Sequence, residues 1–301
     1  MSWYQANLGE IAALLTAVFW TATALAFESA SVKVGSLAVN VIRLFIGLFF
    51  LSVYTLFLRG ALLPTDATGY QWFWLSLSGF VGFVLGDLFL FKSYTIIGSR
   101  FAMLIMTLVP PLTAIQGRLI LGERLTLYSY VGMLLTFSGI VLAIFSRADR
   151  KSRYKLKLAP KGVLLALGGA IGQASGLVLS KFGMQDYDPF AATQIRIITG
   201  IFGFAVLVSF LGRWKRVYQA LFNKNAMMGI TTGSFFGPFL GVSFSLLAVK
   251  YTETGIASTI MAIVPVLIIP PAVIFFKQKV TGIEVVGALL SVTGVTLFFL
   301  K

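Results

Sequence analysis

The 301-residue chain contains no cysteine and no histidine, and only 10 of its residues are acidic. The lack of cysteine excludes thiol catalysis and thiolate metal sites. The lack of histidine excludes imidazole catalysis and imidazole metal ligands, and it removes the side chain that titrates near neutral pH. We therefore expect no catalytic centre, no metal site and no cofactor.

Charge is also scarce, because only 11% of the residues are charged while 58% are hydrophobic. Soluble domains have roughly 25% charged residues, so most of this surface must face lipid instead of water. A spanning helix needs roughly 20 apolar residues, and ten spans would use about 200. The remainder suffices for short connections and tails. The composition thus predicts an all-α integral, multi-pass protein of the cell (inner) membrane.

Uncharged runs separated by short polar breaks predict about ten transmembrane helices, since only helices satisfy the backbone of such segments in lipid. The runs lie near Leu8–Phe27, Leu37–Leu58, Tyr70–Phe91, Phe101–Ile120, Leu127–Phe145, Gly162–Ser180, Phe190–Leu211, Ala226–Val249, Ile256–Phe276 and Gly282–Leu300.

The chain repeats itself across a basic linker at residues 147–161, which we predict to be cytoplasmic. Residues 1–146 and 162–301 then form two five-helix repeats. The matching pairs keep their order at an offset of 153 to 155: Ile42-Arg43 with Ile195-Arg196, Gly82 with Gly237, Val109-Pro110 with Val264-Pro265, Gly132 with Gly287, and Gly139 with Gly294. Five spans per repeat predict opposite insertion of the two copies. Such inverted-topology repeats are typical of secondary transporters, although a gene duplication alone would leave the same pattern.

The junction Gly122-Glu123-Arg124-Leu125-Thr126 between the fourth and fifth spans resembles that of the EamA-type, ten-helix members of the drug/metabolite transporter superfamily. The resemblance covers nearly the whole chain. In the second half the junction reads Lys277-Gln278-Lys279-Val280-Thr281, and Thr21 follows Trp20 where the family commonly has glycine. The resemblance implies a cavity lined by the first four helices of each half, with spans five and ten at the periphery. It does not specify a substrate, because relatives move amino acids, sugars, nucleotide conjugates and other metabolites.

Charged residues within spans are the first candidates for substrate binding, because a charge at mid-membrane costs at least about 2.5 kcal/mol. Arg43 and Arg196 lie at symmetric positions, and so do Glu28 and Lys181. In one arrangement Glu28 lies near Arg43, which leaves Arg196 and Lys181 to attract an anion. In the other, all four reach the interface or form structural pairs.

Asp87 lies deep in the third span, and its repeat counterpart is Val242. A carboxyl group at this depth could bind a cationic group or carry a coupling proton. It could equally form a fixed pair with Lys92 or Arg43.

Trp20 and Gln173 occupy equivalent positions in spans one and six, and we include them as substrate-binding candidates. Pro110 and Pro265 lie within spans, where each removes a backbone donor and bends its helix. A second set of candidates for packing or hinge motion recurs every four residues, a spacing that permits close helix approach: Gly233, Gly237 and Gly241.

These features predict a secondary transporter that moves a small polar or amphipathic metabolite by alternating access. Its transport could be coupled to the movement of protons. The alternative is a lipid flippase or scramblase. The sequence has no phosphate-binding loop for nucleotide hydrolysis, which argues against an ATP-driven pump. It also has no pair of acidic residues on one span, so we do not expect an enzyme. The basic residues lie mostly between apolar runs, so we expect no nucleic-acid partner, and we expect a monomer or homodimer.

Sixteen of the 24 basic residues lie in odd-numbered connections, which the positive-inside rule places in the cytoplasm. Both termini are then predicted outside the cytoplasm. The family resemblance implies the opposite, since many relatives have cytoplasmic termini. We follow the charge distribution.

Overall fold

The computed structural model describes residues 3–146, 159–274 and 280–299, and these residues are helical apart from short connections. Residues 147–158 of the predicted basic linker lie outside the described residues, as do the predicted ends of spans nine and ten.

The first half contains α1 (Trp3–Ala6), α2 (Leu8–Val34), α3 (Ser36–Arg59), α4 (Gly69–Gly79), η1 (Phe80–Gly86), α5 (Asp87–Met106), α6 (Val109–Gln116), η2 (Gly117–Leu121) and α7 (Leu127–Ser146). The second half contains α8 (Pro160–Met184), α9 (Pro189–Phe210), α10 (Trp214–Leu221), α11 (Lys224–Ser234), η3 (Phe235–Gly241), α12 (Val242–Tyr251), α13 (Thr254–Met261), α14 (Val264–Leu267), α15 (Ile269–Ile274), α16 (Gly282–Thr296) and η4 (Leu297–Phe299).

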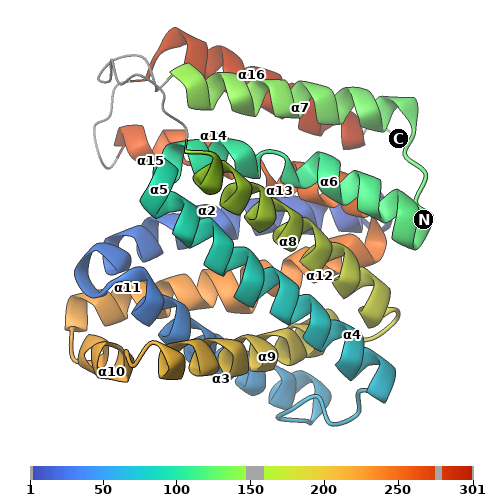
Figure 1. The fold of residues 1–301 in the computed structure, drawn as a ribbon. Helices are drawn as coiled ribbons and strands as arrows, with labels where there is room; N and C mark the ends of the chain where they lie inside the picture. Colours follow the sequence, from blue (N-terminus) through green and yellow to red (C-terminus); the bar gives the residue numbers. More distant parts are fainter. Residues whose placement is uncertain (1–2, 147–158, 275–279, 300–301) are drawn as a thin grey trace.

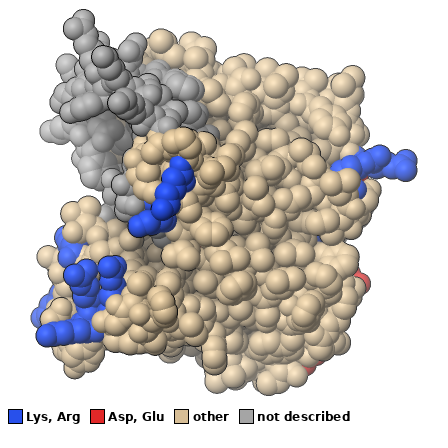
Figure 2. Space-filling view, in the orientation of Figure 1, with Lys and Arg blue, Asp and Glu red and all other residues tan. Residues whose placement is uncertain are grey.

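Eight helical segments among the described residues are long and apolar enough to cross a membrane, and Leu127–Ala143 is a shorter apolar helix. With the run from α5 through α6, they make up the expected bundle of about ten spans. In Figure 1, α7, α16, α3 and α9 run across the view while α5 and α8 cross it obliquely, and both chain ends lie at one end of the bundle. Between basic side chains near its left and right edges, the face in Figure 2 is almost free of charge. This is the surface that a lipid-embedded protein requires.

The structure corrects one predicted break. A polar connection was expected between spans three and four, around Lys92 to Arg100, but α5 runs through it as far as Met106. In the second half, by contrast, the chain breaks at Thr252 and Glu253 between α12 and α13. At the repeat offset of 155, Ile97 and Gly98 occupy the places of Thr252 and Glu253. The start of α13 is held by a residue distant in the sequence, because the Glu123 carboxylate accepts from the Thr254 backbone N–H at 2.9 Å.

The two repeats meet symmetrically through α7 and α16, which pack side by side along one edge of the bundle (Figure 1). Thr136 Oγ1 donates to the Ser291 carbonyl at 3.4 Å, and Ser291 Oγ donates to the Thr136 carbonyl at 3.3 Å. These residues are 155 apart, which is the repeat offset. An added Cβ at Gly287 would lie 2.7 Å from the Gly139 carbonyl, so glycine permits this close approach. Spans five and ten lie at the edge of the bundle, as the family resemblance implied.

The remaining spans pack across the two repeats. Helix α2 of the first half lies against α11, η3 and α12 of the second, and α8 of the second half lies against α4, η1 and α5 of the first. The predicted glycine positions allow this contact: an added Cβ at Gly237 would lie 2.8 Å from Thr23, one at Gly241 would lie 2.6 Å from the Trp20 ring, and one at Gly233 would overlap Phe27. The centre of the bundle is therefore built from both halves.

Two π-helical segments, η1 and η3, occupy the same place in the two repeats, 155 residues apart. A π turn interrupts the regular helical hydrogen bonds, and such turns often mark functional positions. Pro238 lies within η3 and lacks a backbone donor, but the equivalent residue in η1 is Phe83. The shape is thus shared by both repeats without depending on proline. In η1, the Gly82 carbonyl accepts a hydrogen bond from Gln173 Nε2 at 3.3 Å.

Candidate functional site

A cavity of about 420 Å³ lies between the two repeats, with lining residues from α2, η1, α5, α6, α8, α9, α12, α13 and α14. Its wall is mostly apolar and includes the Trp20 and Phe83 rings. The polar side chains that reach it are few: Thr107, Gln173, Arg196, Ser245 and Ser258. Small-molecule sites have this character, a predominantly apolar pocket with a small number of placed polar groups.

Of the described residues that line this cavity, Arg196 on α9 is the one that carries a charge. It is only 5% exposed, and its guanidinium carbon lies 4.7 Å from the centroid of the Phe83 ring. Its Nε atom is buried without a hydrogen-bond partner. Within residues 3–146, 159–274 and 280–299, no carboxylate forms an ion pair with Arg196. The cavity therefore contains a buried cation that has no carboxylate counter-ion among the described residues.

Arg43, the repeat counterpart of Arg196, has a different environment. Its Nη2 atom lies 2.7 Å from Asp87 Oδ2, which is the fixed-pair alternative from the sequence. Asp87 Oδ1 accepts a second hydrogen bond from Gln173 Nε2 at 3.0 Å. The side chain of Glu28, the other expected neighbour of Arg43, lies outside the described residues. The pair thus joins spans two and three of the first half to span six of the second.

Trp20 and Gln173 both line the cavity, as their equivalent sequence positions suggested. Each lies against a glycine in the π-helical segment of the opposite half. An added Cβ at Gly241 would lie 2.6 Å from Trp20, and one at Gly86 would lie 3.4 Å from Gln173 Nε2. Gln173 thus lines the cavity and also donates hydrogen bonds to the Gly82 carbonyl and the Asp87 carboxylate.

Pro110 and Pro265 each occupy the second residue of a restarted helix, α6 or α14. The preceding interruptions, at residues 107–108 and 262–263, are also related by the repeat offset. Thr107, Ala262 and Pro265 line the cavity. Two symmetric helix interruptions therefore border the central space.

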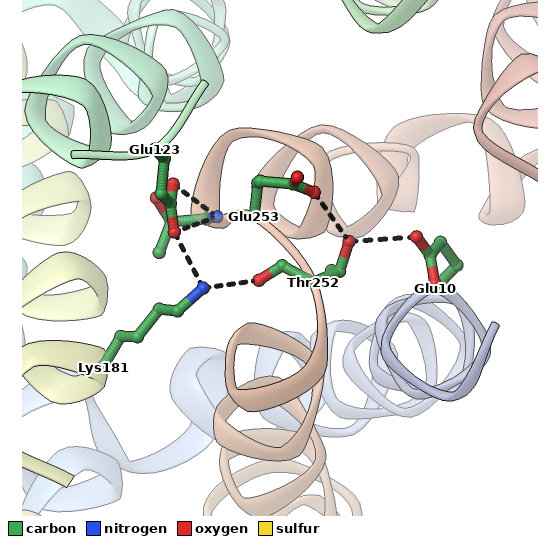
Figure 3. Close-up of polar contacts among 6 residues, drawn as sticks. Glu10, Glu123, Lys181, Thr252 and Glu253 are labelled. Carbon is green, nitrogen blue, oxygen red and sulfur yellow. Dashed lines mark hydrogen bonds and ion pairs between the residues drawn. The ribbon is translucent and has the colours of Figure 1, made fainter. Parts of the chain in front are cut away.

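Lys181 is not among the residues that line the cavity with Arg196; it forms a structural pair instead, the second alternative from the sequence. Its Nζ atom lies 2.8 Å from Glu123 Oε1 and donates to the Thr252 carbonyl at 2.7 Å (Figure 3). The physical reason is the approach of the Glu123 carboxylate, which satisfies the lysine charge near the end of α8.

Glu123, a residue of the family junction, holds the beginning of α13. Its carboxylate accepts from the Thr254 backbone N–H at 2.9 Å and from Thr254 Oγ1 at 2.6 Å. A carboxylate at a helix N-terminus stabilises the unpaired N–H groups and the positive end of the helix dipole. Thr252 Oγ1 also donates to Glu10 Oε1 at 2.9 Å, which extends the network to α2 (Figure 3). Sequence reasoning recognised the Glu123 motif but not the helix that it caps.

A second set of contacts closes the same end of the bundle, between the α3–α4 loop and the α8–α9 loop. Arg59 Nη2 lies 2.6 Å from Asp66 Oδ2, and the Tyr187 hydroxyl donates to Asp66 Oδ1 at 2.8 Å. Burial, together with this bond to Asp66, raises the pKa of Tyr187 to about 12. Burial opposes ionisation of Asp66, but its bonds from Tyr187 and Arg59 hold the pKa of this carboxyl below its ordinary value. Tyr187 therefore remains a donor to an ionised Asp66 at neutral pH.

Comparison with known proteins agrees with this architecture. A protein of known crystal structure superposes with a TM-score of 0.76 at 18% identity, covering 98% of this chain and 97% of the other, which shows the fold. An uncharacterised protein of Haemophilus influenzae is 26% identical over 109 residues, which are 36% of this chain and 80% of the relative. The EamA-like transporter family matches residues 7–145 and 160–300, one match for each repeat. The chain belongs to the EamA-like transporter family and is a multi-pass membrane transporter of the drug/metabolite transporter superfamily.

Proposed function

We propose that this protein is a secondary transporter that carries a small polar or amphipathic metabolite by alternating access. The observation that carries the proposal is the central cavity, whose lining comes from equivalent positions of both repeats, such as Trp20 and Gln173. In transporters with inverted repeats, the substrate lies near mid-membrane between the repeats, which exchange conformations around it.

The two ends of the molecule supply a second argument. Polar contacts between the repeats close the end where the chain termini lie, through Glu123, Lys181 and Thr254 and through Asp66 and Tyr187. Alternating access requires these contacts to separate when that end opens. The interruptions before Pro110 and Pro265 are the places where the bordering helices would bend, and we assign them the role of hinges.

We infer that the closed end faces away from the cytoplasm. The exposed basic residues around α10, which include Arg213, Lys215 and Arg216, lie on the connection at the opposite end of the bundle (Figure 1). By the positive-inside rule, that opposite end is cytoplasmic.

Uptake by proteoliposomes tests the proposal. The purified protein is reconstituted and offered a pool of labelled metabolites, with and without a pH gradient, beside an Asp87→Asn variant. Accumulation of one compound that requires the gradient and Asp87 would establish a proton-coupled carrier and name its substrate. Gradient-dependent accumulation that is unchanged in the variant would assign coupling to another group. Absence of accumulation of any soluble compound by folded protein would refute solute transport.

One observation favours lipid movement as a second candidate function. A lateral cavity of about 380 Å³ lies between α6, α7 and α13, and it shares Thr107 and Ala262 with the central cavity. Its wall is apolar and includes Ile115 and Leu134, which are 58% and 66% exposed. An apolar opening toward lipid is what a flippase or scramblase needs for an acyl chain. Movement of a fluorescent phospholipid between leaflets, measured by dithionite quenching, would support this candidate.

A further inference from the structure

The second repeat contains an arginine whose acidic partner is absent. Arg43 and Arg196 are repeat counterparts, and so are Asp87 and Val242. In the first half, Arg43 Nη2 and Asp87 Oδ2 are 2.7 Å apart. Valine has no acceptor for a hydrogen bond, so the same geometry in the second half leaves Arg196 without a counter-ion. Val242 and Arg196 both line the central cavity.

A buried charge without a partner is unfavourable, and an unpaired buried polar atom calls for an explanation. Arg196 is only 5% exposed, so it is more than nine-tenths buried, and its Nε atom has no hydrogen-bond partner. Its contact with the Phe83 face is a cation–π interaction, which replaces only part of what a carboxylate would provide. The other cation considered for this region, Lys181, is already neutralised by Glu123. The unsatisfied positive charge in the cavity is therefore that of Arg196.

The rest of the cavity defines what must accompany an anionic group. Phe83, Leu90, Leu177 and Met261 present apolar surface, while the amide nitrogen of Gln173 is already engaged by the Gly82 carbonyl and Asp87. A volume of about 420 Å³ is within the range of sites for small organic molecules. The guanidinium fork matches the oxygens of a carboxylate or a phosphate.

We propose that Arg196 is the anion-recognition residue of the central cavity and that the substrate is an organic anion, an acidic oxygen group on an apolar body. The proposal rests on the proposed function, because it takes the cavity to be the transport site. It adds the substrate class and the residue that selects it. The acidic group could belong to a soluble carboxylate or to an anionic lipid, so the experiment contains an arm for each.

Binding to the purified full-length protein provides the test. The soluble probes are 3-phenylpropionate and octanoate, each compared with its own amide, and the lipid probe is dihexanoyl phosphatidic acid. Each acid should bind at least tenfold more tightly than its amide. Arg196→Gln should remove that preference, a loss of at least tenfold, or about 1.4 kcal/mol. Arg196→Lys should retain part of the preference, because it keeps the charge but not the fork.

Val242 supplies a test that keeps the arginine. Val242→Asp restores the acid found in the first half and should neutralise Arg196, so the preference for acids should disappear. Val242→Asn, nearly the size of aspartate but uncharged, is the matched control and should lower the preference for acids far less than Val242→Asp does. A structural arginine would not respond to this pair of variants, since neither alters Arg196 itself.

The outcomes separate the ligand source and the two proposals. Arg196-dependent binding of phosphatidic acid alone would keep the anion site and assign it to lipid. Equal binding of acids and amides, no binding of any acid to folded protein, or an unchanged preference in Arg196→Gln or Val242→Asp would overturn the anion site. If acids bind through Arg196 but nothing crosses the proteoliposome membrane, the site stands and transport fails. If neutral metabolites are carried equally well by Arg196→Gln, transport stands and the site fails.

Discussion

Removing the charge of Glu123 should open the terminus end of the protein. Glu123 makes three contacts across the bundle: with Lys181 Nζ at 2.8 Å, with the Thr254 N–H at 2.9 Å and with Thr254 Oγ1 at 2.6 Å. Glu123→Gln is nearly isosteric but replaces a carboxylate by a neutral amide. A hydrogen bond to a charged group contributes about 1.5–3 kcal/mol, and a neutral one contributes about 0.5–1.5.

The loss is therefore about 1 kcal/mol for each contact and about 3 kcal/mol in total. These contacts join the repeats at the closed end, and the proposed alternating access would break them when that end opens. The substitution consequently destabilises the closed state selectively. A shift of about 3 kcal/mol changes the ratio of open to closed molecules by about 100-fold, since each 1.4 kcal/mol is a factor of ten.

The absence of native cysteine makes the assay direct. Ser258→Cys places one thiol in the cavity wall, where the native side chain is only 4% exposed. Its reaction with a membrane-impermeant thiosulfonate added from the terminus side should accelerate by up to about 100-fold when Glu123→Gln is added, if reaction follows the open fraction. The Lys181→Met variant should accelerate this reaction too. The combined effect of the two substitutions should be less than additive, because both remove the same contact between Lys181 and Glu123. An unchanged rate in folded Glu123→Gln protein would refute the assignment of this network as a closure.

Two further predictions concern packing and orientation. Gly287→Ala should lower the free energy of unfolding by about 1–3 kcal/mol in thermal denaturation, because its Cβ would lie 2.7 Å from backbone atoms of α7. Gly282→Ala, in the same helix with no atom within 4 Å, should leave stability unchanged or slightly higher, and an equal loss in both would contradict the packing argument. A C-terminal reporter that is active only in the cytoplasm should be silent, because the charge distribution places the termini outside, whereas an active reporter would reverse the orientation.

Much of the architecture could be predicted because its signals are local. Apolar length predicts spans, and glycine spacing predicts close helix contacts, which Gly237 and Gly241 make with Thr23 and Trp20 of α2. The partner of a charged residue is harder to predict, since it depends on how helices from different parts of the chain meet. Asp87 was open to two partners. Lys181 was open to two arrangements, because Glu123, with which it pairs, is 58 residues away in the sequence.

The π-helical segments were missed for a different reason. Neither η1 nor η3 has a residue type that demands a π turn, since proline occurs in only one of them. Their signal lies in the tertiary context: glycines of α8 pack closely against η1, and side chains of α2 pack closely against η3. The continuity of α5 had no local signal either, because the matching break before α13 is held by Glu123, which is distant in the sequence.

The repeats differ at the position where the proposed function needs a difference, and moving one acid between them tests this. Asp87→Val leaves both Arg43 and Arg196 without counter-ions, which should cost about 3–5 kcal/mol, as when one partner of a buried pair is removed. Adding Val242→Asp should recover most of that loss, because the pair re-forms around Arg196 at the symmetric position. The Trp20 indole N–H, at the place that Gln173 has in the other half, is the available second donor.

In the double variant the unpaired cation becomes Arg43, which does not line the cavity. Thermal unfolding should therefore be near that of the native protein, while binding of organic acids should be lost. A double variant that is as unstable as Asp87→Val would show that the two arginine positions are not structurally equivalent. Retained acid binding would show that the free charge of Arg196 does not select the ligand. The exchange therefore separates two contributions. The symmetry of the fold determines whether an arginine pair can form in either half, and the presence of valine in place of the acid determines which arginine is free to bind the ligand.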